Sequence, residues 1–352
     1  MEYKWGSKYV TGEEITPKPG FVTFKECDKA ILMLHKHIAS NSTIAIHCDV
    51  DVDGIGSGYI MGRFLSTQTS SRPLYIINND KVHGIQQKHA DFFLNKPIDL
   101  MIIVDSSSNE LDVIKQFNCD VLVIDHHMIE HNDTYGKTND GEHEYIIINN
   151  VIDNLDNFNI KSIKCWFSKI NSSVSEKLGA YKADDRMSCG LVVYELLRIY
   201  CETFMLGPVL ENLRLYQWAG VTLLTDSIIL NTDRNQWYMD NTVHSMEIEG
   251  TLKELLTGLS DFKVTLDKSV ISYTIAPVIN KAIRAGKSKE ALKTVIYCPK
   301  TIGELLKYRE DQDKALVIGS TNVHIESSHI LRDLTDTDIS RNYFGVIASK
   351  LS

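Results

Sequence analysis

Three aspartates, Asp49, Asp51 and Asp53, alternate with valines just after an apolar run at residues 44–46. Such a run is typical of a buried strand, and residues two apart in an extended chain share a face. The three carboxylates should therefore converge beyond the strand end, where they repel one another unless a cation lies among them. Carboxylate oxygens suit Mg²⁺ and Mn²⁺, so this stretch predicts a divalent metal site, with a polar loop as the plain alternative.

The order D-x-D-x-D-G also opens an EF-hand calcium loop, which needs a glutamate at its twelfth position. Counted from Asp49, the twelfth residue is Ile60, so the EF-hand is excluded.

Later segments bring further acidic or imidazole groups to the ends of apolar runs, namely Asp105, Asp125, His126, His127 and Asp226. Taken singly, an aspartate in such a place is as readily a helix N-cap as a ligand, and a lone histidine is more often structural. Taken together, Asp and His without paired thiolates suit Mn²⁺ or Mg²⁺ better than structural zinc. The combination favours a metal centre over a polar loop.

Alternating strands and helices must position these groups. Apolar runs predict a strand that starts at residue 44 and further strands at residues 74–77, 100–105, 121–127 and 145–148. Helical spacing predicts a helix within residues 21–40 and further helices at 59–65, 88–94 and 111–117. Strands that are apolar throughout indicate a parallel sheet covered on both faces. Ligands bind such sheets at the carboxyl ends of the strands, where the acidic residues lie. We therefore expect an α/β catalytic domain over residues 1–230.

The remaining chain changes character. Helices are expected at 188–200, 210–224, 246–259 and 301–314, a loop at the polar residues 231–241, and strands at 315–318 and 343–348. Residues 281–293 hold five lysines and arginines against one glutamate. We expect a helical linker over 231–314 with a basic phosphate-binding segment, then an incomplete second α/β unit over 315–352.

Composition limits the function classes. The chain has 352 residues, a formal net charge of −9 and seven cysteines without a C-x-x-C pair. The negative charge argues against a protein that coats nucleic acid by bulk charge, although bound divalent ions would make a nuclease site locally positive. No apolar run is long enough for a membrane span, and no signal peptide is visible. We expect a cytoplasmic protein with reduced thiols.

The ordered motifs resemble the DHH phosphoesterase superfamily. They are the D-x-D-x-D-G stretch, Ile102-Ile103-Val104-Asp105, Asp125-His126-His127 and Leu223-Leu224-Thr225-Asp226, and together they span roughly residues 44–230. Two further segments resemble the RecJ branch of single-strand-specific 5′-to-3′ exonucleases. Residues 78–86 carry His83 where RecJ proteins have tyrosine, and residues 276–286 match at Pro277 and Asn280.

The resemblance implies two divalent metal ions, Mn²⁺ by preference or Mg²⁺. One ion would be held by His47, Asp51 and Asp105, with Asp49 as an alternative to His47, and the other by Asp53, Asp105, His126 and Asp226. Two ions clamp both oxygens of an in-line phosphoryl displacement.

The same resemblance implies roles for the remaining groups. Asp125 would orient a histidine, and His127 would contact the scissile phosphate or protonate the leaving oxygen, with a structural role as the alternative. His83, Asn280, Lys281 and Arg284 would bind substrate. For Lys281 and Arg284, a solvated helix face is the alternative.

The expected function is a RecJ-like exonuclease on single-stranded DNA. Two departures from RecJ keep alternatives open. His47 precedes Asp51 by four residues, a spacing that resembles manganese pyrophosphatases and short-oligonucleotide phosphodiesterases. The end of the chain resembles the start of a DHHA1 domain but lacks its Gly-Gly-His motif, so residues 315–352 are expected to pack on the catalytic domain or to be completed by a second polypeptide. The alternatives are a phosphodiesterase of short oligonucleotides or cyclic dinucleotides, and a non-catalytic scaffold subunit.

Overall fold

The computed structural model describes residues 18–22, 24–79, 82–151, 186–259 and 265–297, and the backbone of two short paired strands, β7 (Val323–Glu326) and β8 (His329–Arg332). The helix expected at 301–314 and the strands expected at 315–318 and 343–348 lie outside these residues.

A six-stranded sheet with the order β2-β1-β3-β4-β6-β5 forms the centre of the molecule. Its strands are β1 (Ile44–Cys48), β2 (Leu74–Ile77), β3 (Leu100–Val104), β4 (Asp120–Asp125), β5 (Tyr135–Lys137) and β6 (Glu144–Asn149). Five run parallel, and β5 pairs antiparallel with β6 at one edge. The expected α/β class is confirmed. The edge strand was not expected, because its three residues form no apolar run.

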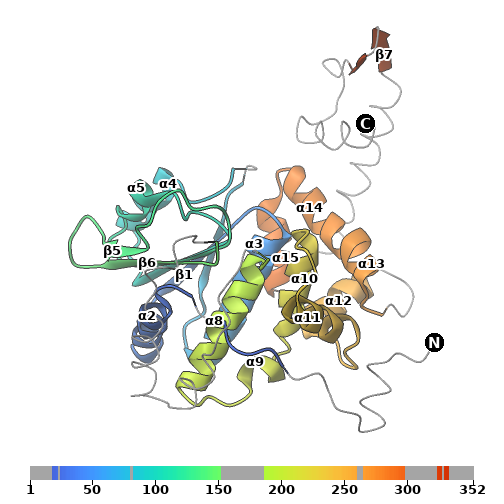
Figure 1. Cartoon of the computed structure of the whole chain (residues 1–352). Helices are drawn as coiled ribbons and strands as arrows, with labels where there is room; N and C mark the ends of the chain where they lie inside the picture. Colours follow the sequence, from blue (N-terminus) through green and yellow to red (C-terminus); the bar gives the residue numbers. More distant parts are fainter. Residues whose placement is uncertain are drawn as a thin grey trace.

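Strand side chains alternate between two hydrophobic cores. On β3, Leu100, Ile102 and Val104 face the larger core, whereas Met101 and Ile103 face the smaller one. The larger core is covered by α2 (Cys27–Ala39), α3 (Val52–Gln68), α8 (Cys189–Thr203) and α10 (Tyr216–Thr225), and the smaller by α4 (Gln87–Leu94) and α5 (Leu111–Ile114). Figure 1 shows α4 and α5 on one side of the sheet and α2 on the other. No helix among the described residues is long and apolar enough to cross a membrane.

A second group of helices extends the larger core away from the sheet. It comprises α9 (Val209–Asn212), α11 (Asp233–Val243), α12 (Gly250–Leu259), α13 (Lys268–Val270), η2 (Ile271–Ile275), α14 (Ala276–Arg284) and α15 (Ser288–Tyr297). Ile271, Ile279 and Val295 belong to the same cluster of buried side chains as the strands. The described part of the expected linker therefore packs into the same core as the sheet.

The prediction of a loop at residues 231–241 was wrong, because α11 occupies most of this segment. The Thr232 hydroxyl caps this helix by accepting a hydrogen bond from the Asn235 backbone N–H. The buried positions Asn235, Tyr238, Met239 and Thr242 recur at helical spacing, but two are polar. Asn235 is satisfied by donating to two backbone carbonyls, so a hydrophobic pattern could not reveal the helix.

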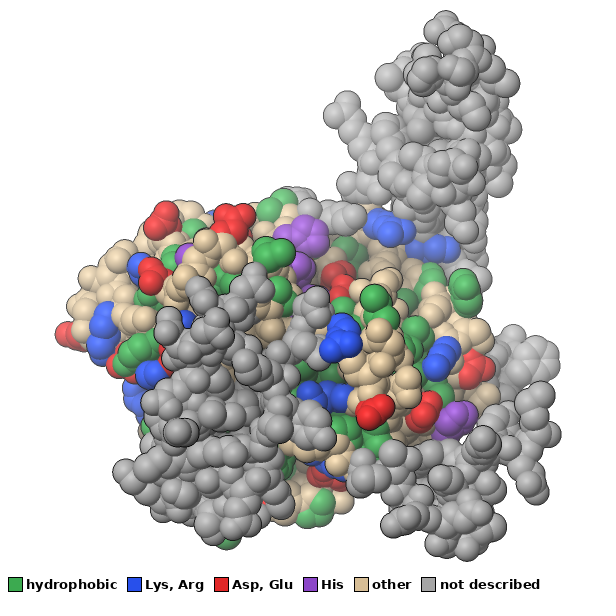
Figure 2. All heavy atoms as spheres, viewed as in Figure 1, with side chains coloured by type: hydrophobic (Ala, Val, Ile, Leu, Met, Phe, Trp, Pro, Cys, Tyr) green, Lys and Arg blue, Asp and Glu red, His purple; other side chains and the backbone are tan. Residues whose placement is uncertain are grey.

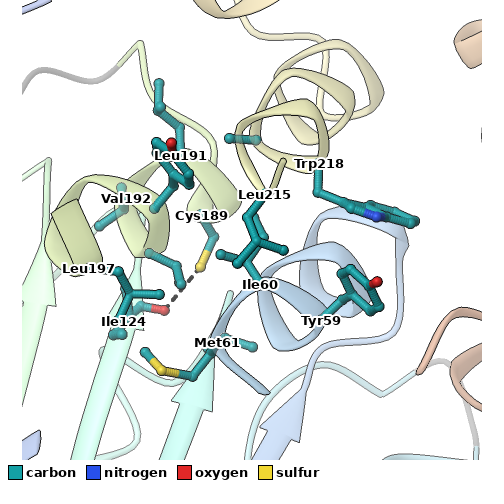
Figure 3. Packing of buried hydrophobic residues seen from close by; sticks show 14 of the residues in the cluster. Tyr59, Ile60, Met61, Ile124, Cys189, Leu191, Val192, Leu197, Leu215 and Trp218 are labelled. Carbon is teal, nitrogen blue, oxygen red and sulfur yellow. Dashed lines mark hydrogen bonds between the residues drawn. The ribbon is translucent and has the colours of Figure 1, made fainter. Parts of the chain in front are cut away.

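Three helices pack very closely where α8 begins. Figure 3 shows Ile60 of α3, Leu191 of α8 and Trp218 of α10 as parts of one cluster of buried side chains. A Cβ atom built on Gly190 would lie 2.4 Å from the Thr222 hydroxyl oxygen. Only glycine at this position therefore lets α8 and α10 meet.

Gly190→Ala should lower the free energy of unfolding by about 1–3 kcal/mol, because overpacking a tight core forces side chains off their rotamers. Gly250→Ala is the matched control, since a Cβ there meets nothing within 4 Å. Urea unfolding of both variants provides the measurement. Equal stability of Gly190→Ala and wild type would contradict the assigned packing.

Candidate metal centre

The carboxyl ends of three neighbouring strands carry the candidate ligands. Asp49 follows β1, Asp105 follows β3, and Asp125 ends β4, and these strands lie side by side in the sheet. Two helices complete the site. Asp53 lies in the first turn of α3, and Asp226 is the C-cap of α10.

The sequence suggested that the three alternating aspartates share one face of an extended chain. In the structure they do not. Strand β1 ends at Cys48, Asp51 is the N-cap of α3, and Asp53 is helical. The helix can begin this early because residue 54 is a glycine that lies against the Asp49 backbone. A Cβ atom on residue 54 would lie 2.7 Å from the Asp49 backbone nitrogen. The turn divides the aspartates between two groups of ligand atoms.

The first group gathers around His126. Its Nε2 atom lies 3.7 Å from Asp53, 3.2 Å from Asp105 and 3.6 Å from Asp226, measured to carboxylate oxygens. The other ring nitrogen, Nδ1, lies 3.1 Å from the Met187 carbonyl oxygen, which can only accept a hydrogen bond. In the neutral ring the Nδ1 atom therefore carries the proton, and the lone pair on Nε2 points at three carboxylates. A cation at this point would turn repulsion into coordination.

The second group consists of Asp49, Asp51 and Asp105, whose nearest carboxylate oxygens lie within 4.8 Å of one another. Asp105 also forms a set of the same compactness with His126 and His127. Asp105 is thus common to both sides of the site.

Asp105 is a buried group of the site without side-chain hydrogen bonds. It is 1% exposed, and neither of its carboxylate oxygens has a hydrogen-bond partner. Burial, then the charges of Asp53 and Asp51, raise the pKa of Asp105 well above its ordinary value. Its backbone adopts the left-handed region, with φ 66°, which costs on the order of 1–3 kcal/mol for a residue other than glycine. Unpaired buried oxygens in a strained position fit a metal ligand.

Asp53 is held by the start of α8. Its two carboxylate oxygens accept hydrogen bonds from the backbone N–H groups of Cys189 and Gly190, at 2.7 and 2.8 Å. Burial is the main reason that the pKa of Asp53 rises to about 7, with His126 opposing the rise and the charge of Asp51 adding to it. The helix fixes this carboxylate so that it faces His126.

His127 and Asp125 form a separate dyad. His127 Nδ1 donates to Asp125 at 2.8 Å, and Asp125 also accepts from the backbone N–H groups of His126 and Ser108. The hydrogen bond to Asp125 raises the pKa of His127 to about 9. Although burial raises the pKa of Asp125, the bond and the charge of His127 hold it at about 2. The His127 side chain is 55% exposed, so Asp125 presents a protonated imidazole at the surface.

His47 and Asp49 lie on the smaller-core side of the site. Asp49 is bound through both carboxylate oxygens, by His83 Nδ1 at 2.6 Å and by the Gly84 backbone N–H at 3.1 Å. His47 is fully buried, and neither of its ring nitrogens has a hydrogen-bond partner. Burial, with His89 nearby, lowers the pKa of His47 to about 3, so the ring is neutral and has the form that binds metals.

The expected substrate-binding groups Asn280, Lys281 and Arg284 line a pocket of about 320 Å³. Its opposite wall includes Thr225 and Ser227, the neighbours of Asp226. The pocket therefore adjoins the metal centre. In Figure 2, histidine side chains lie at the sheet edge and lysine and arginine side chains over α14, on the same face of the molecule.

Backbone groups of the site were missed in the sequence. The Met187 carbonyl and the N–H groups at the start of α8 orient His126 and Asp53. Ser107 also accepts a hydrogen bond from the Ile85 backbone N–H, which secures the loop that carries His83. Among these groups, only Ser107 could have been suspected from the sequence, because it belongs to a run of three serines after Asp105.

Comparison with known families supports the resemblance drawn from the motifs. Residues 43–144 match the model of the DHH family, N-terminal domain. Two curated proteins are each 24% identical over 271 residues, covering 75% of this chain and 39% of the relative. They are "Putative SPbeta prophage-derived single-strand DNA-specific exonuclease YorK" of Bacillus subtilis (strain 168) and "Putative single-strand DNA-specific exonuclease yorK" of Bacillus phage SPbeta. The chain thus spans about two fifths of their length.

Solved structures share the fold. Exonuclease RecJ bound to manganese is 18% identical, with a TM-score of 0.68, and the match covers 94% of this chain and 78% of that one. RecJ from Thermus thermophilus in complex with Mn²⁺ is 17% identical, with a TM-score of 0.65, over 98% of this chain and 48% of that one. The resemblance to the DHH family and to RecJ proteins is confirmed, and the sheet and its helices match the fold of the solved RecJ structures.

Asp105→Asn should stabilise the protein in chelator at pH 8. A carboxyl group whose pKa is higher in the folded protein than its unfolded value of about 3.9 does not destabilise the fold below pH 3.9. Above that pH it lowers the free energy of unfolding increasingly as the pH rises. Asparagine carries no charge and tolerates the left-handed region. Thermal unfolding should therefore show similar midpoints near pH 4 and a higher midpoint for the variant at pH 8.

The exposed Asp112→Asn serves as the control and should match wild type at both pH values. A stability difference between Asp105→Asn and wild type that does not change with pH would contradict the assigned repulsion.

Proposed function

We propose that this chain is a divalent-metal-dependent phosphodiesterase that hydrolyses single-stranded DNA from its 5′ end, as a RecJ-like exonuclease. The observation that carries the proposal is Asp105, buried and without hydrogen-bond partners between two groups of ligand atoms. The names of the two curated relatives support single-stranded DNA as the substrate, and the solved RecJ structures with Mn²⁺ or Mg²⁺ support the choice of metal.

In this proposal two ions, Mn²⁺ by preference or Mg²⁺, bind between the acidic groups. Asp53, Asp105, His126 and Asp226 would hold one, and His47, Asp51 and Asp105 would hold the other, with Asp49 supporting the second set. The compact sets of ligand atoms in the structure include Asp49, Asp51 and Asp105 but not His47, so the unpartnered ring nitrogens of His47 are what support its place here. Bound divalent ions polarise the phosphoryl group and lower the pKa of an attacking water. The unpartnered atoms of Asp105 and His47 fit this role, because each would otherwise pay an uncompensated cost of burial.

The chain's own residues would position the substrate and move a proton. His127 is protonated at neutral pH, and its hydrogen bond to Asp125 holds the ring in place. It can therefore donate a proton to the leaving oxygen or a hydrogen bond to the scissile phosphate. Asn280 and Arg284 would bind non-bridging phosphate oxygens in the adjoining pocket, as would Lys281.

The expected surroundings of the protein are also part of the proposal. All five described cysteines are free thiols, which suits the reducing cytoplasm. Single-stranded nucleic acid is the proposed partner, and a second polypeptide is a further one.

The substrate class needs a direct comparison. Purified chain with Mn²⁺ should shorten 5′-labelled single-stranded DNA faster than it cleaves dinucleotide RNA or a cyclic dinucleotide, and the label should be released first. Faster cleavage of the short substrates would favour the phosphodiesterase alternative. No cleavage of any of the three would favour the scaffold subunit.

Asp105→Ala should reduce turnover of the preferred substrate by at least about 100-fold. Loss of a group that merely supports a metal ligand already costs about 10–100-fold, and Asp105 would be shared by both ions. Asp112→Ala is the control for an exposed aspartate, and circular dichroism verifies folding. Wild-type turnover by folded Asp105→Ala would refute the site assignment.

The variants His47→Ala and Asp49→Asn test which of the two residues would bind the metal directly and which would only orient other groups. We expect His47→Ala to weaken Mn²⁺ binding more than Asp49→Asn does, because the nitrogens of His47 are unpaired whereas Asp49 is hydrogen-bonded to His83 and Gly84. Isothermal titration with Mn²⁺ measures both affinities. The reverse order would make Asp49 the ligand and His47 a packing residue.

A further inference from the structure

An exposed aromatic residue directly follows a residue that lines the pocket of Asn280, Lys281 and Arg284. Tyr273 in η2 is 77% exposed, more than any other aromatic side chain among the described residues. Its neighbour in the sequence, Ser272, lines the pocket together with Pro277 and Asn280. No step of the proposed hydrolysis uses this ring.

Pro277 accounts for the unusual turn that carries Tyr273. A proline within a helix cannot donate to the carbonyl four residues earlier, and its ring collides with that carbonyl. The carbonyl four residues before Pro277 is that of Tyr273. The helix widens into a π-helical turn over Ile271–Ile275 and then continues directly as α14. Such widened turns occur frequently at functional sites.

The ring belongs to the same helix face as the pocket groups. Residues three or four apart lie on one face of an α-helix, and Pro277, Asn280 and Arg284 follow that spacing in α14. Tyr273 precedes Pro277 by four residues, in the π-helical turn. All four are exposed or partly exposed. The opposite face is buried in the larger core through residues such as Ile275, Val278, Ile279 and Ile283. The tyrosine therefore extends the row of pocket groups by one helical turn.

We propose that Tyr273 stacks on a nucleobase of a single-stranded nucleic acid whose backbone phosphate occupies the pocket. The inference rests on the proposed function and names a base-binding position for it. Stacking on aromatic rings tolerates every sequence, because each base has a π-face. A duplex keeps its bases stacked on each other, so a ring in this position selects for single strands.

Charge complementarity supports a nucleic acid as the occupant. The segment from Lys281 to Lys293 contains five lysines and arginines and the single acid Glu290. Figure 2 shows lysine and arginine side chains over α14, on the same face of the molecule as histidine side chains at the sheet edge. Aromatic rings beside a basic groove are the usual combination in proteins that bind single strands without reading their sequence.

The test is a binding experiment on the full chain with Ca²⁺ in place of Mn²⁺, after a check that no product forms. Fluorescence anisotropy with a 5′-phosphorylated 12-nucleotide oligo(dT) should show an affinity about 5- to 100-fold weaker for Tyr273→Ala than for wild type. Tyr273→Trp should retain wild-type affinity. Tyr135→Ala is the matched control, since Tyr135 is exposed on the edge strand β5, across the sheet from α14 (Figure 1).

Strands with one abasic nucleotide at successive positions separate stacking from other roles of Tyr273. At one position, removal of the base should weaken binding to the wild type by the same factor as Tyr273→Ala weakens binding to the intact strand. At that position, Tyr273→Ala should bind the abasic strand no more weakly than it binds the intact strand. Equal affinities of Tyr273→Ala and wild type, or additive losses at every position, would overturn the inference. Failure of wild type to bind any strand would instead count against the proposed function.

Discussion

Repulsion among buried carboxylates is the constraint on which the rest of this structure depends. Asp105 has no hydrogen-bond partner and is held in a strained backbone conformation. Asp53 and Asp226 lie close to the same imidazole, His126, whose free nitrogen faces all three acids. Without a cation this cluster costs free energy through burial and repulsion. The fold must therefore supply enough stability elsewhere to keep the cluster assembled.

That stability comes from two sources close to the site. The parallel strands are apolar on both faces and are covered by helices, so the strand ends that carry Asp49 and Asp105 are fixed by the cores behind them. The junction of α3, α8 and α10 is the second source. There Gly190 permits close packing, and its N–H group also binds Asp53. Packing and ligand orientation thus depend on the same few residues.

Much of this arrangement could be predicted from residue pattern. Apolar runs that end in aspartate or histidine indicated the parallel strands and the site, because buried parallel strands have an unmistakable composition. Three features were not predicted from the residue pattern. Helix α11 uses polar side chains such as Asn235 to fill a buried face, β5 has no apolar run, and Asp53 sits in a helix that begins earlier than the apolar spacing showed. The backbone partners of His126 and Asp53 come from a distant part of the chain, so no local pattern could reveal them.

The central proposal is that Asp105 would be a ligand shared by two divalent ions. Anomalous X-ray diffraction from crystals of the chain grown with Mn²⁺ tests it most directly. The account predicts two anomalous peaks, both within bonding distance of the Asp105 carboxylate, one beside His126 and Asp226 and the other beside Asp51. A single peak that Asp105 does not contact, or no peak at this edge of the sheet, would contradict it.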